Sequence, residues 1–265
     1  MSNQKFLLTI LAVLLAITAA LGIVLVILEV SDGKPQETDA PTVTDAPKTD
    51  KPEPEIPSVM FKAGLEEYEK YMDVTDEKYL VLVNKESTID DSFKPEKLVK
   101  VKDAHKDIEL SETAEMALEA MFKEMRKEGF DGVFVTSAYR SYSYQTSLFN
   151  TYINNEMATG LSYAAAKDKV LTYSALPGTS EHHTGLCVDL MTNSMSDLDE
   201  SFADDPVYPW LLENAWKFGF ILRYPKDKVD ITGYSFEPWH YRFVGRYHAY
   251  KIHEQGLCLE EYLEK

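Results

Sequence analysis

The chain has 265 residues, of which 45% are hydrophobic, so it is long enough for one medium-sized folded domain with appended segments. Its 27 Lys and Arg residues against 44 Asp and Glu residues give a formal net charge of −17. A surface with this negative charge repels the phosphate backbone of DNA and RNA, so we expect no nucleic acid partner. The two cysteines, Cys187 and Cys258, form no C-x-x-C pattern, which excludes both a disulfide framework and a zinc site built of thiolates.

The N-terminal region contains an uncharged stretch of 23 residues, from Phe6 to Leu28. As a helix it would be about 35 Å long, enough to cross a hydrocarbon core of about 30 Å. A cleaved signal peptide is the alternative, but its apolar part normally has only about 7–15 residues. Lys5 precedes the stretch and acidic residues follow it. We therefore expect an uncleaved, single-pass anchor in the cell membrane over residues 1–30. The positive-inside rule predicts that its N-terminus is cytoplasmic and that the remaining chain is extracellular.

Residues 31–57 are rich in Pro, Thr and Asp and contain a doubled T-D-A-P sequence. They offer almost nothing to bury, so the entropy of ordering them is not offset, and we expect a disordered tether. A Pro-rich recognition ligand is the alternative, although no basic residue accompanies a PxxP core in the usual way. The folded domain is then expected over residues 58–265.

Helices and strands are predicted in irregular order along this domain. The apolar stripe between Ser111, as N-cap, and Gly129 predicts a helix with acidic residues in its first turn. Because the chain lacks a regular βαβ alternation, the predicted class is α+β. The other expected helices cover residues 61–73, 144–157, 162–175, 210–220 and 246–256, and the expected strands cover residues 78–85, 132–140, 185–192 and 239–245.

Three of the six histidines lie among other polar residues. His182 and His183 precede the predicted strand that carries Asp189, and His240 comes much later, in the sequence EPWH. One carboxylate and two imidazoles suffice for a catalytic Zn²⁺ that keeps a fourth position open. A buried histidine bonded to a strand aspartate is the alternative interpretation.

Glu237 stands three residues before His240, with Pro238 between them. A β-turn here would bring both side chains to one side of the chain. A carboxylate beside the metal, but not bound to it, is the general base that zinc hydrolysis requires. Glu237 on its own is equally compatible with an ordinary surface turn.

Together these residues resemble a known family. Ser180, His182 and Asp189 form S-x-H-x6-D, which is followed by EPWHYR at residues 237–242; SAYRSYSYQ and FILRYP occupy residues 137–145 and 220–225. This order resembles the VanY-type zinc D-alanyl-D-alanine carboxypeptidases of bacterial cell walls, over about residues 78–257. The resemblance implies the Hedgehog/D,D-peptidase fold, a small α+β zinc domain with a central antiparallel sheet.

The resemblance also implies residue roles. His182, Asp189 and His240 would bind one Zn²⁺ per chain, and Glu237 would be the catalytic base. The S-x-H spacing selects His182 over His183. Arg140, Gln145 and Ser180 would hold the substrate; a guanidinium can bind a terminal carboxylate in a bidentate way, although a structural ion pair is the alternative for Arg140.

For three neighbouring residues the motif implies no specific chemical role. Trp239 and Tyr241 flank the last ligand and would form a wall of the cleft, unless they are core residues of a half-buried strand. Cys187 stands where the family usually has a small Ala, and we expect a buried, small hydrophobic residue there. A disulfide to Cys258 stays an alternative.

The sequence thus predicts a membrane-anchored zinc metallo-carboxypeptidase. Its expected partner is a peptidoglycan stem peptide ending in D-alanine, from which it removes that residue in cell-wall remodelling. One alternative is an L,D-carboxypeptidase acting on tetrapeptide stems, and another is a non-catalytic, zinc-stabilised wall-binding module.

Overall fold

The structure, a computed structural model, describes residues 58–264. The predicted membrane anchor over residues 1–30 and the predicted tether over residues 31–57 lie outside the described residues. Within residues 58–264, no helix combines the length and the apolar character needed to cross a membrane.

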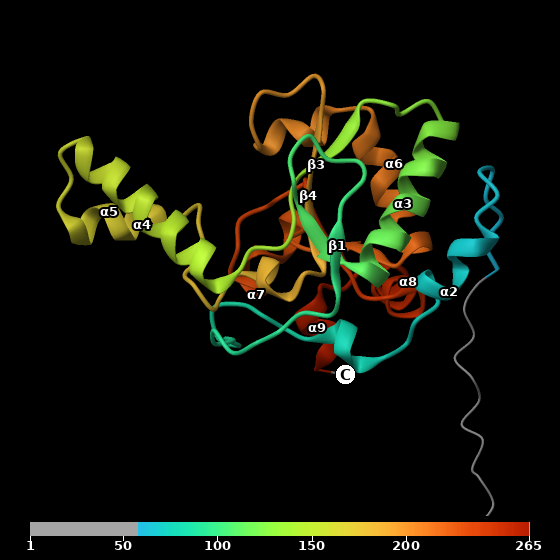
Figure 1. Ribbon diagram of the computed structural model, residues 1–265, viewed down its shortest axis with the longest axis horizontal. Coiled ribbons are helices and arrows are strands. Elements are labelled where there is room, and N and C mark those ends of the chain that lie inside the picture. The colour runs from blue at the N-terminus through green and yellow to red at the C-terminus, as the bar shows by residue number, and fades with distance from the viewer. Residues whose placement is uncertain (1–57, 265) are drawn as a thin grey trace, which may run out of the picture. The chain divides into compact units, whose positions relative to one another are not determined.

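A four-stranded sheet lies at the centre of this part of the chain (Figure 1). Its strand order is β3-β4-β6-β5 and every neighbouring pair is antiparallel, so the predicted central antiparallel sheet is confirmed. A separate antiparallel pair joins β1 and β2. The strands are β1 (Leu98–Lys100), β2 (Glu109–Ser111), β3 (Val133–Ser137), β4 (Cys187–Thr192), β5 (Phe220–Leu222) and β6 (His240–Phe243).

The apolar stripe that follows Ser111 forms α3 (Glu112–Lys127), with Ser111 at its N-cap position as predicted. The stripe packs against one face of the sheet and forms the main core with it. Full burial of a large apolar side chain in this way contributes about 1.5–3 kcal/mol to the stability of the folded state. From the helix the core includes Leu118, Met121, Phe122 and Met125, and from the sheet it includes Val188, Leu190, Tyr241 and Phe243.

The two-residue period of the strands divides β4 and β6 between two environments. Val188 pairs with Tyr241, and both belong to the main core. Asp189 pairs with His240, and these neighbours point to the opposite face because successive side chains alternate along a strand. The sheet therefore has a core face and a face that carries polar, chemically active side chains.

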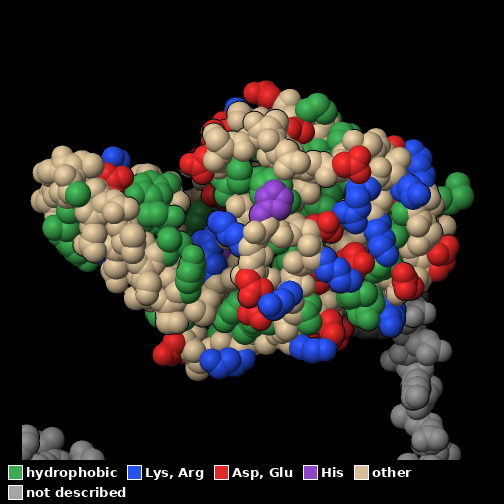
Figure 2. Space-filling model, turned by 45° about the horizontal axis from the view of Figure 1, so that its top comes forward, with side chains coloured by type: hydrophobic (Ala, Val, Ile, Leu, Met, Phe, Trp, Pro, Cys, Tyr) green, Lys and Arg blue, Asp and Glu red, His purple; other side chains and the backbone are tan. Residues whose placement is uncertain are grey.

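Two helices form an arm that projects from the rest of the molecule (Figure 1). They are α4 (Tyr142–Ala158) and α5 (Tyr163–Val170), and they enclose a small core of their own, made of Phe149, Ile153, Ala166 and Val170. Hydrophobic side chains also lie on the surface of the arm (Figure 2).

The remaining helices are short, and two of them form the C-terminal end of the described chain. Gly256 caps α8, the helix expected over residues 246–256, in the left-handed conformation, and a further helix, α9, follows it. The α-helices are α2 (Glu69–Met72), α6 (Val207–Asn214), α7 (Val229–Thr232), α8 (Arg246–Gln255) and α9 (Leu259–Leu263), and the 3₁₀ turns span Glu66–Tyr68, Glu77–Leu80, Glu181–Thr184, Glu200–Asp204, Ala215–Phe218 and Lys226–Lys228.

The strand predicted over residues 78–85 is wrong. Residues Glu77–Leu80 form a 3₁₀ turn, and no strand follows them up to residue 85. The buried Arg242 guanidinium donates hydrogen bonds to the carbonyl oxygens of Tyr79 and Val81, both at 2.9 Å. A side chain thus satisfies the backbone acceptors that a neighbouring strand would otherwise satisfy.

Candidate metal and active site

Three predicted metal ligands converge on the polar face of the sheet. Asp189 lies between the two imidazoles: its Oδ2 is 3.2 Å from His182 Nε2, and its Oδ1 is 3.1 Å from His240 Nδ1. The side chains of His182, Asp189 and His240 are only 6%, 3% and 4% exposed. His182 comes from the 3₁₀ turn before β4, and Gly185, with φ +65°, turns the chain from there into the strand.

Hydrogen bonds to the backbone and to Glu181 fix how each imidazole presents its free nitrogen. His182 Nδ1 donates to the Ala138 carbonyl oxygen at 2.6 Å, so Nε2 is the nitrogen left to bind a metal. His240 Nε2 donates to Glu181 Oε2 at 3.2 Å, so Nδ1 is the nitrogen left to bind a metal. The buried Asp189 Oδ1 accepts no hydrogen bond despite its closeness to His240. Two imidazole nitrogens, once unprotonated, and an unsatisfied carboxylate oxygen are a donor set that fits Zn²⁺.

Without metal, these groups hold one another in charged forms. Burial and Arg140 lower the pKa of His182, but Asp189 and Cys187 together raise it to about 9. Burial raises the pKa of Asp189, yet the two imidazoles hold it well below its ordinary value. Because a metal ion binds the unprotonated imidazoles, its binding must release protons from this cluster.

Behind His240 lies a buried ionic network that the sequence did not reveal. Glu181 Oε1 accepts hydrogen bonds from Arg223 Nε at 2.8 Å and from Arg242 Nη1 at 2.6 Å. Arg223 in turn holds both oxygens of Glu260 on α9, at 2.7 and 2.8 Å. Burial opposes ionisation of Glu181, but the two guanidinium groups keep its pKa below the ordinary value. Glu181 therefore stays an ionised acceptor for the His240 ring.

The turn predicted between Glu237 and His240 is present. The His240 backbone N–H donates to the Glu237 carbonyl oxygen at 3.2 Å, which closes the turn. Glu237 Oε2 lies 3.4 Å from His240 Nδ1, and the Glu237 side chain is 27% exposed. A carboxylate at the edge of the ligand set, in contact with solvent, has the position of a base that can exchange protons with water.

Arg140 follows β3 and links the ligand set to the arm. Its Nη2 donates to Asp189 Oδ2 at 3.2 Å, its Nη1 to Gln145 Oε1 at 3.2 Å, and its Nε to Ser137 Oγ at 3.1 Å. Gln145 is fully buried and donates to the Ala175 carbonyl oxygen at 2.8 Å, so it orients the guanidinium. Ser180 is also buried, directly before the 3₁₀ turn that carries His182.

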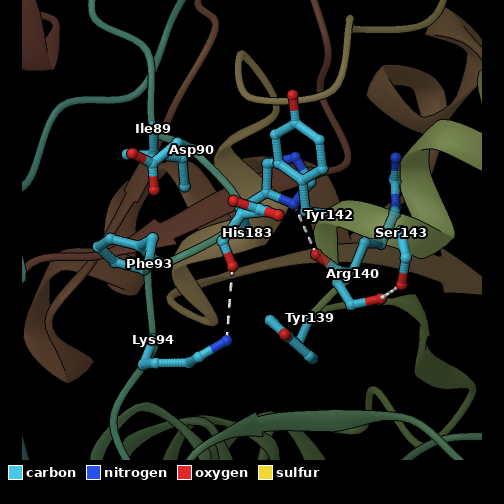
Figure 3. A pocket seen from close by; sticks show the side chains of 11 residues that line it. Ile89, Asp90, Phe93, Lys94, Tyr139, Arg140, Tyr142, Ser143 and His183 are labelled. Carbon is cyan, nitrogen blue, oxygen red and sulfur yellow. Dashed lines mark hydrogen bonds between the residues drawn. The ribbon is translucent and has the colours of Figure 1, made fainter.

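A pocket of about 270 Å³ opens beside Arg140 (Figure 3). Phe93, Lys94, Tyr139 and Tyr142 are among the side chains around it. His183 also lines this pocket: its Nδ1 donates to the Arg140 carbonyl oxygen at 2.7 Å, and its Nε2 accepts from the Gly178 N–H at 3.1 Å. Both ring nitrogens of His183 are therefore occupied by the backbone, unlike those of His182.

The remaining predicted residues differ in position. Tyr241 does not line the cleft: it is completely buried in the main core, because it alternates with His240 along β6. Trp239 is partly buried and packs against the same core. The alternative of a disulfide is wrong, since Cys187 and Cys258 are both free and buried. The sulfur of Cys187 and one nitrogen each of His182 and His240 all lie within 4.8 Å of one another.

Comparisons with known proteins match the sequence and the fold of this chain to one group. A family model described as VanY, D-alanyl-D-alanine carboxypeptidase, matches residues 107–246. A D-alanyl-D-alanine carboxypeptidase of Enterococcus faecalis is 47% identical over 135 residues, which are 50% of this chain and 48% of that protein. The match thus spans about half the length of that relative.

Two solved structures are also similar. One is a mutant of VanY, a vancomycin-resistance D,D-pentapeptidase, in complex with Zn(II): it has a TM-score of 0.60 and 38% identity, and the match covers 71% of this chain and 99% of that one. The other is the LdcB LD-carboxypeptidase, with a TM-score of 0.63, 35% identity and coverage of 73% and 89%. That structure is described as revealing the molecular basis of peptidoglycan recognition.

Proposed function

Because this chain belongs to the VanY family of D-alanyl-D-alanine carboxypeptidases, we propose that it is a zinc-dependent carboxypeptidase of the cell wall. Its substrate is a peptidoglycan stem peptide, from which it removes the C-terminal D-alanine. The observation that carries this proposal is the convergence of His182, Asp189 and His240, with Glu237 at their edge. A purely structural zinc site needs the ligands but no such carboxylate.

The two histidines and Asp189 would hold one Zn²⁺ per chain. When bound, zinc lowers the pKa of a water molecule and polarises the scissile carbonyl group. Glu237 accepts the proton of the attacking water on its carboxylate and then delivers it to the leaving amine of D-alanine. Its partial exposure allows the carboxylate to reach the substrate and regain its charge after each cycle.

Arg140 is the residue that we assign to the substrate's chain end. Its side chain is 21% exposed, contacts the ligand Asp189 and lines the pocket of Figure 3. A free C-terminal carboxylate can bind there through two parallel hydrogen bonds. Gln145 keeps the guanidinium in place through its Oε1 atom. Ser180, which directly precedes the turn that carries His182, stays a proposed substrate contact.

The direct test is to incubate the purified full-length chain with pentapeptide stems and to follow free D-alanine by mass spectrometry. We expect release from pentapeptide, loss of release with a chelator, and its return when zinc is added. Glu237→Gln should keep the zinc and lose the activity. Full activity of Glu237→Gln would contradict the assigned base and favour another mechanism.

A second specificity has an observation in its favour. The similarity to an LD-carboxypeptidase structure covers nearly the same share of this chain as the similarity to the D,D-pentapeptidase. Tetrapeptide stems are therefore the matched second substrate in the same assay. Release from tetrapeptide alone would replace the D,D assignment with an L,D assignment, and release from neither would favour a wall-binding module.

We propose further that the N-terminal stretch from Phe6 to Leu28 anchors the protein in the cell membrane, with the domain outside. Its length, its lack of charge and the basic residue before it support this topology. The full-length chain should remain in the membrane fraction, and protease added to intact cells should degrade the domain. A soluble secreted form that begins after this stretch would show a cleaved signal instead.

A further inference from the structure

His183 directly follows the proposed ligand His182, and its ring connects two segments of the backbone (Figure 3). Its Nδ1–H donates to the Arg140 carbonyl oxygen at 2.7 Å, and its Nε2 accepts from the Gly178 N–H at 3.1 Å. The residue is buried, and the Tyr142 ring stacks on its imidazole with ring centroids 5.6 Å apart. Two hydrogen bonds and one stacking contact thus fix the orientation of this imidazole.

The two segments are those through which the arm joins the rest of the domain. Arg140 lies just before α4, and Gly178 follows α5. The Arg140 N–H also donates to the His182 carbonyl oxygen, at 3.2 Å, so both polar backbone groups of Arg140 bind the turn that carries this ligand. Gly178 is held in turn, because its carbonyl oxygen accepts from the Ile89 N–H at 2.9 Å. The base of the arm is therefore tied to the metal-binding turn.

We propose that His183 is a positioning residue that sets the distance between the Arg140 guanidinium and the metal ligands. This inference rests on the proposed function, in which that guanidinium holds the substrate's terminal carboxylate. Hydrogen bonds from its own side chain orient the guanidinium, whereas His183 fixes the backbone from which it extends. An exopeptidase cuts at a set distance from the chain end, and a displacement of about 1 Å at such a contact can lower the rate by about a hundredfold.

The test compares two variants of the full-length, zinc-loaded protein on two substrates. His183→Leu removes both hydrogen bonds, whereas the amide of His183→Gln offers an acceptor to the Gly178 N–H and a donor to the Arg140 carbonyl oxygen. On the stem peptide that the wild type cleaves, His183→Leu should lower kcat/KM by about tenfold to a hundredfold, mainly through kcat. His183→Gln should stay within about threefold of the wild type.

The second substrate is the same peptide with an amidated C-terminus. It has no terminal carboxylate for Arg140 to bind, so His183→Leu and the wild type should cleave it with the same kcat/KM. A ring that merely supports the fold would affect both substrates equally. His253→Leu, at an exposed position of α8, is the matched control and should change neither value.

The failures of the two proposals are distinguishable. Equal losses on both substrates, unchanged activity of His183→Leu, or the same loss in His183→Gln would overturn the role of His183 and leave the proposed function standing. So would loss of zinc from folded His183→Leu in metal analysis. If His183→Leu does not fold, His183→Asn, whose shorter amide reaches only one of the two backbone groups, is judged by the same outcomes. A wild type that releases D-alanine from neither stem peptide would overturn both proposals.

Discussion

Glu181→Gln tests whether Glu181 positions the metal ligand His240 in addition to stabilising the fold. The Glu181 carboxylate is completely buried and accepts hydrogen bonds from His240, Arg223 and Arg242. Gln has nearly the same size but carries no charge, and its amide nitrogen cannot accept a hydrogen bond. The substitution therefore weakens the support of the His240 ring and removes the negative charge between two buried guanidinium groups.

Two magnitudes follow from these contacts. Loss of an outer partner of a metal-binding histidine typically weakens metal affinity by about 10–100-fold, so we expect a loss in that range. Breaking a buried ion pair on one side typically costs about 3–5 kcal/mol of unfolding free energy. Glu260 still pairs with Arg223 at 2.7 Å, so we expect a stability loss at or below the lower end of that range.

The assay compares Glu181→Gln with Glu260→Gln, which disturbs the same Arg223 but makes no contact with His240. Zinc affinity is measured by chelator competition and stability by urea unfolding of the metal-free proteins. Both variants should lose stability, but only Glu181→Gln should lose zinc affinity. Equal zinc affinity in both variants and the wild type would refute the idea that Glu181 positions the ligand.

Three other substitutions have definite expected outcomes. Arg140→Lys should lower kcat/KM by about tenfold to a hundredfold without changing zinc content, because a charge-assisted bond is worth about 1.5–3 kcal/mol; loss of zinc would show a structural role instead. Burial raises the pKa of Glu115 from 4.5 to about 7, so the folded state keeps a proton that the unfolded state has lost. The contribution of Glu115 to the free energy of unfolding therefore falls as pH rises from 4.5 to about 7. Above that range, Glu115→Gln should be more stable than the wild type by up to about 3 kcal/mol in urea unfolding. The same dependence of stability on pH in the variant and the wild type would contradict this prediction. Gly245→Ala should destabilise the fold by more than about 1 kcal/mol in the same assay, since Gly245 has φ +82° and an added Cβ would collide with the Val74 carbonyl oxygen; wild-type stability would be the opposing result.

Local patterns were enough to predict much of the fold. The helix after Ser111 has a cap position, an acidic first turn and an apolar stripe, and all three features act within a few residues of one another. The turn between Glu237 and His240 was predictable for the same reason. Assigning His182, Asp189 and His240 to one site required the family's motif order, because no local rule pairs β4 with β6.

Two of the errors and omissions come from long-range contacts, and one comes from the alternation of side chains along a strand. Residues 78–85 have a strand-like composition, but Arg242, more than 160 residues after Tyr79 and Val81, binds the carbonyl groups that a strand would use. Tyr241 was placed in the cleft because it neighbours His240, whereas the pleat turns it to the other face. Glu181 gave no signal of its role, since its partners Arg223 and Arg242 lie 42 and 61 residues away.

The separate core of the arm has a consequence for hydrogen exchange. Segments with few contacts to the main core open as independent cooperative units, at a lower free energy than global unfolding. The amide protons of α4 and α5 should therefore exchange earlier than those of β4. Because Gln145 at the start of α4 accepts from the Arg140 guanidinium, each such opening would remove that hydrogen bond and leave Arg140 held by Ser137 and Asp189 alone, while the metal ligands on the sheet keep their places.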